Sequence, residues 1–204
     1  MKLHLGAGKR RINLPGWINV DIDPANEPDV VANAHELFWT GSWLGSRMPQ
    51  NGQGCVADLG YEQPEAIYAC HLLEHFNRHS YKDVLRNWFA VLKPGGILRL
   101  SVPDLEAVFI RYGWRDAVEK GISKLPELLG FLYGGQRNEH DCHKMGWDFA
   151  TLKRDLEEAG FKDVHRYDRD KTEHADVDDY SAAYLPHMDR TGQLMSLNVE
   201  AVKP

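Results

Sequence analysis

Two glycines and an acid near the start of the chain have the types and spacing to hold a nucleoside-containing ligand. Gly6 and Gly8 follow a short run in which Leu3 and Leu5 alternate with polar residues, and Asp21 follows a second apolar run. Because glycine has no Cβ, the backbone there can approach a ligand closely. A carboxylate that follows the second strand of a parallel sheet can accept hydrogen bonds from a ribose. The pattern therefore predicts a nucleoside cofactor.

The glycine pattern departs from the dinucleotide fingerprint G-x-G-x-x-G, in which a third glycine opens a helix. Arg11 stands in the place of the third glycine, and Pro15 and Gly16 leave no room for a full crossover helix. On these residues alone, two alternatives stay open. One is a nicotinamide cofactor, and the other is an ordinary glycine turn between two strands.

A histidine pair further along the chain matches a metal-binding signature. His71, Glu74 and His75 fit H-x-x-E-H, which binds zinc when both histidines lie on one face of a continuous helix. Ser80 and Asp83 resemble a capping box, so we expect 71–75 to lie in the turn before the helix. That placement argues against a protease-type zinc site.

A second group of possible ligands, His140, Cys142 and His143, lies later in the chain. Its spacing matches no common structural zinc site, and polar loop residues explain it better. The sequence therefore predicts no metal.

Alternating strands and helices position these residues. Strands are predicted at 2–5, 17–21, 29–35, 66–70, 97–102, 161–167 and 197–202. Helices are predicted from 81 to the Pro94-Gly95-Gly96 stop, in pieces over 105–133, and from Asp148 to Gly160. Residues 40–54 have no periodicity and indicate a long surface loop. Strands that alternate with helices favour an α/β fold with a parallel sheet.

Composition restricts the class of protein. The 204 residues are enough for one domain, predicted over 1–204, and 43% of them are hydrophobic. No apolar run approaches the roughly 20 residues of a membrane span, and the first strand follows Met1 too closely for a signal peptide. Three scattered cysteines favour reduced thiols, hence a cytoplasmic location. The net charge of −6 argues against a nucleic-acid partner.

Taken in order, these motifs resemble those of the class I S-adenosylmethionine-dependent methyltransferases, closest to a small bacterial branch similar to the type 11 group. The segments that carry the resemblance are Leu-Pro-Gly-Trp-Ile-Asn-Val-Asp at 14–21, His-Leu-Leu-Glu-His at 71–75, Val-Leu-Lys-Pro-Gly-Gly at 91–96 and Ser-Val-Pro-Asp at 101–104. The resemblance implies a Rossmann-like three-layer sandwich. Its seven-stranded sheet would be mostly parallel with an antiparallel last strand, and S-adenosylmethionine would bind at the carboxyl edge.

The resemblance also implies roles for single residues. Gly6, Ala7 and Gly8 would lie against the methionine part of the cofactor, and Asp21, followed by Ile22, would bind both ribose hydroxyls. Asn33 and Ala34 would face the adenine, and Cys70, His71 and Leu72 would form the floor near the sulfonium. Arg10 departs from the family pattern, because many members have a third glycine there.

The predicted reaction is methyl transfer to an oxygen or nitrogen of a small-molecule or sugar-containing (glycan-type) acceptor. The turn after the fourth strand lacks the Asn/Asp-Pro-Pro-aromatic motif of nucleic-acid amino-methylating enzymes. Candidate bases near the methyl group are His143, His75 and Asp104, with His143 favoured because a well-capped helix follows it. A nicotinamide-dependent oxidoreductase and a non-catalytic S-adenosylmethionine-binding module stay as alternatives, and the oligomeric state is left open.

Overall fold

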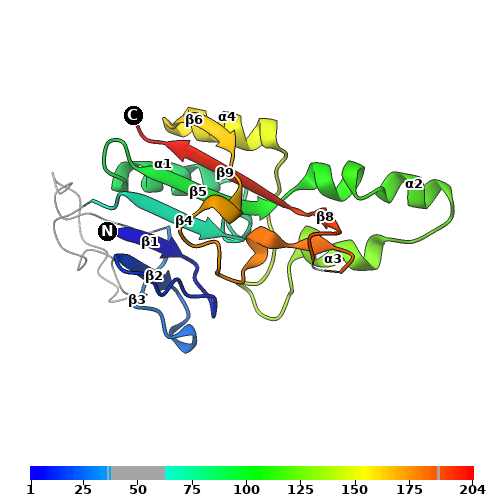
Figure 1. Cartoon of the computed structure of the whole chain (residues 1–204), viewed down its shortest axis with the longest axis horizontal. Helices are drawn as coiled ribbons and strands as arrows, with labels where there is room; N and C mark the ends of the chain where they lie inside the picture. The colour runs from blue at the N-terminus through cyan, green and yellow to red at the C-terminus, as the bar shows by residue number, and fades with distance from the viewer. Residues whose placement is uncertain (36, 38–62, 188) are drawn as a thin grey trace.

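The computed structural model describes residues 1–35, 37, 63–187 and 189–204, and the predicted loop at 40–54 lies outside them. One sheet organises the chain, with strand order β3-β2-β1-β4-β5-β9-β6 (Figure 1). Its strands are β1 (Lys2–Leu5), β2 (Trp17–Asp21), β3 (Val30–Val31), β4 (Ala66–Cys70), β5 (Ile97–Pro103), β6 (Lys162–Arg166) and β9 (Ser196–Val202). Neighbours from β3 to β5 are parallel, whereas β9 is antiparallel to both β5 and β6. The predicted seven-stranded Rossmann-like sheet is confirmed.

Helices α1 (Tyr81–Val91) and α4 (Phe149–Ala159) pack together over one face of this sheet. Beyond the carboxyl ends of the parallel strands, an arm contains a π-helical turn (Ala107–Arg111), α2 (Trp114–Glu119) and α3 (Leu125–Tyr133) (Figure 1). A small hairpin joins β7 (Tyr184–Leu185) to β8 (Gln193–Leu194). None of the helices in the described residues is long and apolar enough to span a bilayer.

The opposite face of the sheet carries short turns instead of long helices, as far as the chain is described. His4 and Tyr68 point to this face, and His174 stacks on the Tyr68 ring with centroids 4.3 Å apart. Further short 3₁₀ helices lie at Pro24–Asn26, Leu73–His75, Arg169–Lys171 and Tyr180–Ala182. The connection between β1 and β2 is too short for a helix, so the later segment covers this face.

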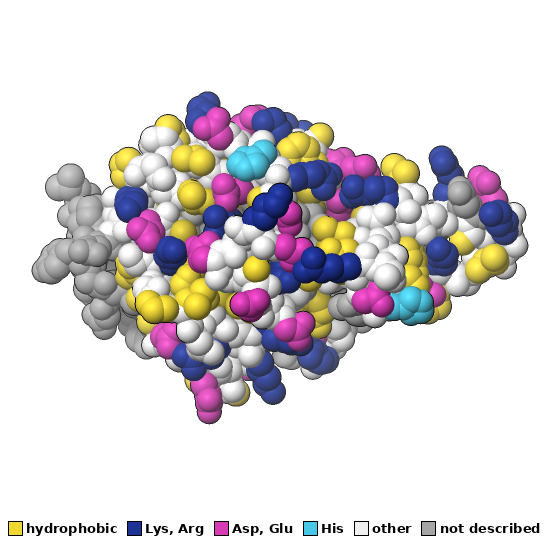
Figure 2. All heavy atoms as spheres, in the orientation of Figure 1, with side chains coloured by type: hydrophobic (Ala, Val, Ile, Leu, Met, Phe, Trp, Pro, Cys, Tyr) yellow, Lys and Arg dark blue, Asp and Glu magenta, His cyan; other side chains and the backbone are white. Residues whose placement is uncertain are grey.

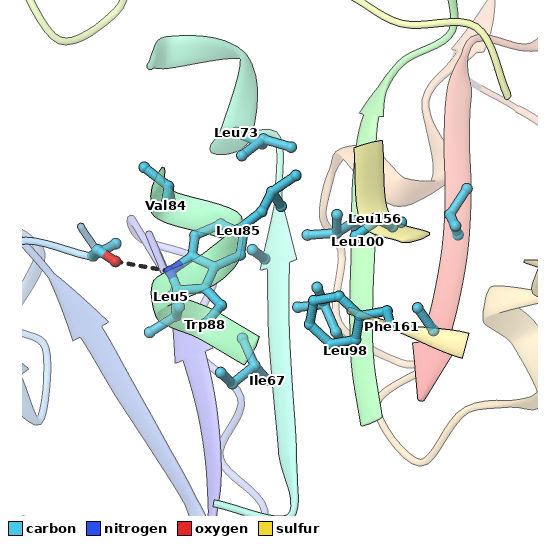
Figure 3. Close-up of a cluster of buried hydrophobic side chains, with 14 of the residues drawn as sticks. Leu5, Ile67, Leu73, Val84, Leu85, Trp88, Leu98, Leu100, Leu156 and Phe161 are labelled. Carbon is cyan, nitrogen blue, oxygen red and sulfur yellow. Dashed lines mark hydrogen bonds between the residues drawn. The ribbon is translucent and has the colours of Figure 1, made fainter. Parts of the chain in front are cut away.

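The main core lies between the sheet and α1, as Figure 3 shows. Val84, Leu85 and Trp88 recur at helical spacing and are fully buried against strand residues such as Leu5 and Ile67. The Trp88 indole Nε1–H donates to the carbonyl oxygen of Ala34 at 2.8 Å (Figure 3). This bond ties the segment after β3 to the helix layer.

Two local predictions were wrong. Ser80 makes no side-chain cap bond at the start of α1, and Asp83 pairs with Arg86 instead, so there is no capping box. The third strand is shorter than 29–35, because Asn33 Oδ1 accepts from the His35 backbone N–H and forms a turn. At α4 the cap prediction is confirmed, since Asp148 accepts from the Thr151 N–H at 2.8 Å.

Candidate active site

The glycine turn after β1 is held against the ends of two neighbouring strands. Gly6 and Gly8 have φ angles of +64° and +52°, which glycine adopts without strain. The Gly6 N–H donates to Val20 O at 2.8 Å, which fixes the turn to β2. A Cβ added at Gly6 would lie 2.8 Å from Leu72 Cδ1, so the positive φ and the close approach of this side chain both favour glycine here.

Asp21, at the end of β2, organises the loop beside the glycine turn. Its Oδ2 accepts from the Gly8 N–H at 2.7 Å, and its Oδ1 accepts from Asp23 N and Asn26 Nδ2. A carboxylate offers about four acceptor positions, so the protein already uses three of them. The side chain therefore has one position left for a ribose hydroxyl, unless the Asn26 amide gives up its place.

A cavity of about 710 Å³ opens between the glycine turn and the segment after α3. Predicted residues that line it are Gly6, Ala7, Gly8, Cys70, His71, His75 and His143. Residues that the sequence analysis missed also line it, among them His4, Lys9, Asn26, Arg137, Asp141, Asp179 and Tyr180. The cavity thus joins the predicted cofactor turn to two of the predicted bases.

The remaining predicted cofactor residues, the buried Asp21 among them, do not line this cavity. Ile22 is 47% exposed, an apolar surface next to Asp21, and Leu72 packs on Gly6. Ala34 is buried beneath the surface, and Asn33 uses its side-chain oxygen in the local turn. The geometry therefore offers Ile22 to a ring placed beside the ribose, but gives Asn33 and Ala34 no direct opening to the cavity.

His71 occupies the turn directly after β4 in a conformation that is rare outside glycine. Its φ angle is +48°, and its Nε2 lies 2.9 Å from Ser196 Oγ. The Ser196 hydroxyl donates to the Tyr180 carbonyl oxygen, so it accepts from His71 Nε2–H. The other ring nitrogen, Nδ1, lies 3.2 Å from Glu74 Oε1. This network holds a strained residue at the cavity wall.

Behind the cavity wall, Glu74 is fully buried; its Oε1 is next to His71 Nδ1, and its Oε2 has no hydrogen-bond partner in the described residues. Burial alone would raise the pKa of Glu74, but the neighbouring His71, His75 and His143 lower it below its usual value. Glu74 is therefore a buried carboxylate among three imidazoles.

His75 and His143 meet edge to face, with ring centroids 5.0 Å apart. His75 Nδ1 lies 3.2 Å from Cys142 O, and His143 Nδ1 lies 2.9 Å from Phe131 O. A carbonyl only accepts, so both Nδ1 atoms donate, and Nε2 is the ring nitrogen that each histidine has left for another partner. Burial lowers the pKa of His75, and the nearby Glu74 opposes that shift.

Asp104 does not line the cavity, contrary to its predicted place beside the methyl group. Its carboxylate pairs with Arg111 and Arg166, and its Oδ1 accepts from the Glu106 and Ala107 backbone N–H groups. With 1% of its surface exposed, the side chain supports the start of the arm.

The comparisons agree with this arrangement. A methyltransferase domain family matches residues 9–166, which is most of the chain, and so the chain belongs to it. The protein is thus a class I S-adenosylmethionine-dependent methyltransferase, as the sequence motifs predicted. No curated protein matches the sequence.

Solved structures share the fold at low identity. One is a possible exported protein from Bordetella parapertussis (TM-score 0.55, 16% identity), and it aligns over all of this chain but only 61% of its own. A second is a possible histamine N-methyltransferase from Thermotoga maritima (TM-score 0.53, 12% identity). The alignment covers 100% of this chain and 82% of that one. A third is the 1,6-didemethyltoxoflavin N1-methyltransferase of Burkholderia thailandensis, solved with S-adenosylhomocysteine (TM-score 0.51, 17% identity). The alignment covers 99% of this chain and 70% of that one.

S-adenosylmethionine fits the residues present. At Gly6 a Cβ would press on the Leu72 side chain, Asp21 keeps one acceptor position, and Ile22 offers an exposed apolar side chain. The Cys70 thiol lies on the cavity floor, and burial raises its pKa, so it stays protonated and is no nucleophile.

Proposed function

We propose that the protein transfers a methyl group from S-adenosylmethionine to an oxygen or nitrogen of a small-molecule or sugar-containing acceptor. The observation that carries the proposal is the single cavity that reaches from the Gly6–Gly8 turn to His75 and His143. Its volume of about 710 Å³ is within the range of small-molecule sites. The family match favours this reaction over hydride transfer to a nicotinamide.

The cavity lining supports a polar acceptor. Arg137 and Asp141 form an ion pair at 2.6 Å on its wall, and Lys9, Asp179 and Tyr180 add further polar groups. Such a mixed lining suits hydroxyl-rich or amine-bearing molecules. On the face shown in Figure 2, Lys and Arg are interspersed with Asp and Glu, which is unlike the single-sign stripe of nucleic-acid binders.

When bound, S-adenosylmethionine supplies a methyl group that its sulfonium already activates, so the chain mainly aligns the reactants and excludes water. Gly6, Gly8 and Asp21 hold the cofactor, and Ile22 supports the adenine side. The proton of an acceptor hydroxyl or ammonium passes to an imidazole lone pair. His143 Nε2 and His75 Nε2 are the available acceptors, because their Nδ1 atoms are occupied.

The proposal includes a cytoplasmic location, which the free thiols of Cys70 and Cys142 support.

Calorimetry with S-adenosylmethionine and NAD tests the cofactor, and only the first is expected to bind. Radiolabelled methyl transfer to pools of sugar-containing molecules, small amines and RNA then tests the acceptor class. Cofactor binding with no transfer to any pool would favour the non-catalytic module, and transfer to RNA alone would overturn the acceptor proposal.

A further inference from the structure

We infer that Glu74, His75 and His143 form a binding site for a divalent transition-metal ion of the Zn²⁺ type at the acceptor end of the cavity. One ring nitrogen of each histidine and one carboxylate oxygen of Glu74 lie within 4.8 Å of one another. His143 Nε2 is 3.8 Å from Glu74 Oε1. Ligand atoms of a tetrahedral zinc ion lie about 3.4 Å apart, given metal–ligand distances near 2.1 Å, so small side-chain shifts complete the site.

The tautomers of the two histidines are those of metal ligands. Each Nδ1–H donates to a backbone carbonyl, of Cys142 for His75 and of Phe131 for His143, so Nε2 is the ring nitrogen left for an ion. His143 Nε2 is the one that faces Glu74 Oε1, at 3.8 Å. A metal-bound histidine characteristically donates its other ring N–H to a carbonyl or carboxylate, which fixes its orientation. Both partners here are backbone atoms, so the orientation is built into the fold.

The buried carboxylate supplies the second line of argument. Glu74 is fully buried; its Oε1 lies 3.2 Å from His71 Nδ1, and its Oε2 has no hydrogen-bond partner in the described residues. A buried charge without partners is costly unless a cation compensates it. His71 Nδ1 reaches Oε1 only, so the second oxygen, Oε2, stays without a partner in the part of the chain that the structure describes. A divalent cation satisfies all three acceptors together.

The ligand types indicate which ion fits. Two imidazoles and one carboxylate suit Zn²⁺ and its first-row neighbours, whereas Mg²⁺ prefers oxygen ligands. His75 and His143 line the cavity and Glu74 lies behind them, so a fourth position faces the cavity. Three protein ligands with one open position are typical of catalytic rather than structural zinc.

This inference is opposed to the sequence prediction that the chain binds no metal, and the titration described below decides between them. The zinc-binding form of H-x-x-E-H needs both histidines of the motif on one face of a continuous helix. In the fold, His75 and Glu74 stay in a 3₁₀ turn, and the third ligand arrives from the segment after α3. With the ion bound, the Nε2 atoms of His75 and His143 are both committed to it, so neither ring then acts as the proton acceptor. The ion would instead lower the pKa of an acceptor hydroxyl bound at the open position, whose proton passes to water. That acceptor role rests on the proposed function, but ion binding does not.

Calorimetric titration of metal-free, tag-free protein with Zn²⁺ tests the site without cofactor or acceptor. We expect one ion per chain and weak or no binding of Mg²⁺. Loss of a supporting group around a metal typically costs 10–100-fold in affinity, so His143→Ala and Glu74→Gln should each weaken Zn²⁺ binding by at least about 100-fold. His140→Ala and Cys142→Ser, which change neighbouring side chains outside the ligand set, should bind as the unchanged protein does.

Co²⁺ gives a second readout, because its absorption spectrum changes only if these side chains bind the ion directly. Its visible absorption bands should appear in the unchanged protein and disappear in His143→Ala, while circular dichroism shows that the variant is folded. The inference is overturned if the protein binds no Zn²⁺, if His143→Ala leaves affinity and spectrum intact, or if Cys142→Ser abolishes binding. Separate titration with S-adenosylmethionine distinguishes this failure from failure of the proposed function.

Discussion

Replacing Asp21 by alanine tests the cofactor anchor most directly. The unchanged carboxylate accepts three hydrogen bonds from Gly8, Asp23 and Asn26 and keeps about one acceptor position for a ribose hydroxyl. A hydrogen bond to a charged group contributes about 1.5–3 kcal/mol. Loss of that one contact should therefore weaken S-adenosylmethionine binding by roughly 10- to 150-fold. Asp21 thus has room for one ribose contact, whereas the family resemblance implied two.

The assay is calorimetric titration of the Asp21→Ala protein with S-adenosylmethionine. Asp23→Ala is the matched control, because Asp23 lies in the same loop, caps the next 3₁₀ turn and makes no side-chain bond to Gly8. We expect the control to bind within about threefold of the unchanged protein. If folded Asp21→Ala protein also binds within threefold, Asp21 is not the ribose anchor and the reasoning is refuted.

Three further predictions concern stability and the glycine turn. Gly6→Ala should weaken S-adenosylmethionine binding more than Gly8→Ala does in calorimetry. Both positions have a positive φ, but only the Cβ at position 6 would press on a Leu72 methyl group, 2.8 Å away. Trp88→Phe should lower the free energy of unfolding by about 2–4 kcal/mol in urea titrations, since it leaves a buried carbonyl unpaired and loses volume. Burial lowers the pKa of His174 to about 4, against about 6.5 in the unfolded chain, so the unfolded state binds the proton more readily and stability falls as pH decreases from 6.5 toward 4. In the His174→Phe variant the free energy of unfolding should fall by about 1–2 kcal/mol less between pH 6.5 and pH 5 than in the unchanged protein. The control His79→Phe, at an exposed position, should show the full loss, and an equal loss in both variants would contradict the assignment.

Patterns of short range predicted much of the fold. The alternation of Leu3 and Leu5 located β1, the spacing of Val84, Leu85 and Trp88 located α1, and the Asp148 cap located α4. Each of these patterns depends on burial or on a local hydrogen bond. Such signals are contained in a few consecutive residues and can be read without the fold.

Signals that depend on distant partners could not be read. Ser80 has a capping residue type, but its neighbours hold it in a different conformation. Asp104 follows a strand at the correct edge, yet the arginines that occupy it come from the arm and from β6. The contact of His143 with Glu74 depends on how the segment after α3 returns to the sheet. The sequence indicated the types of these residues but not their partners.

The position of β9 between β5 and β6 has a consequence for how the protein folds during synthesis. Among the described strands β6 pairs with β9 alone, and β9 is the last strand of the sheet in chain order. Until it leaves the ribosome, one edge of β5 has no partner and β6 has no strand to join. Exposed strand edges of this kind promote association with other chains. A nascent chain that stalls before Ser196 should therefore hold a five-stranded intermediate with an open edge, which is a natural binding site for a chaperone.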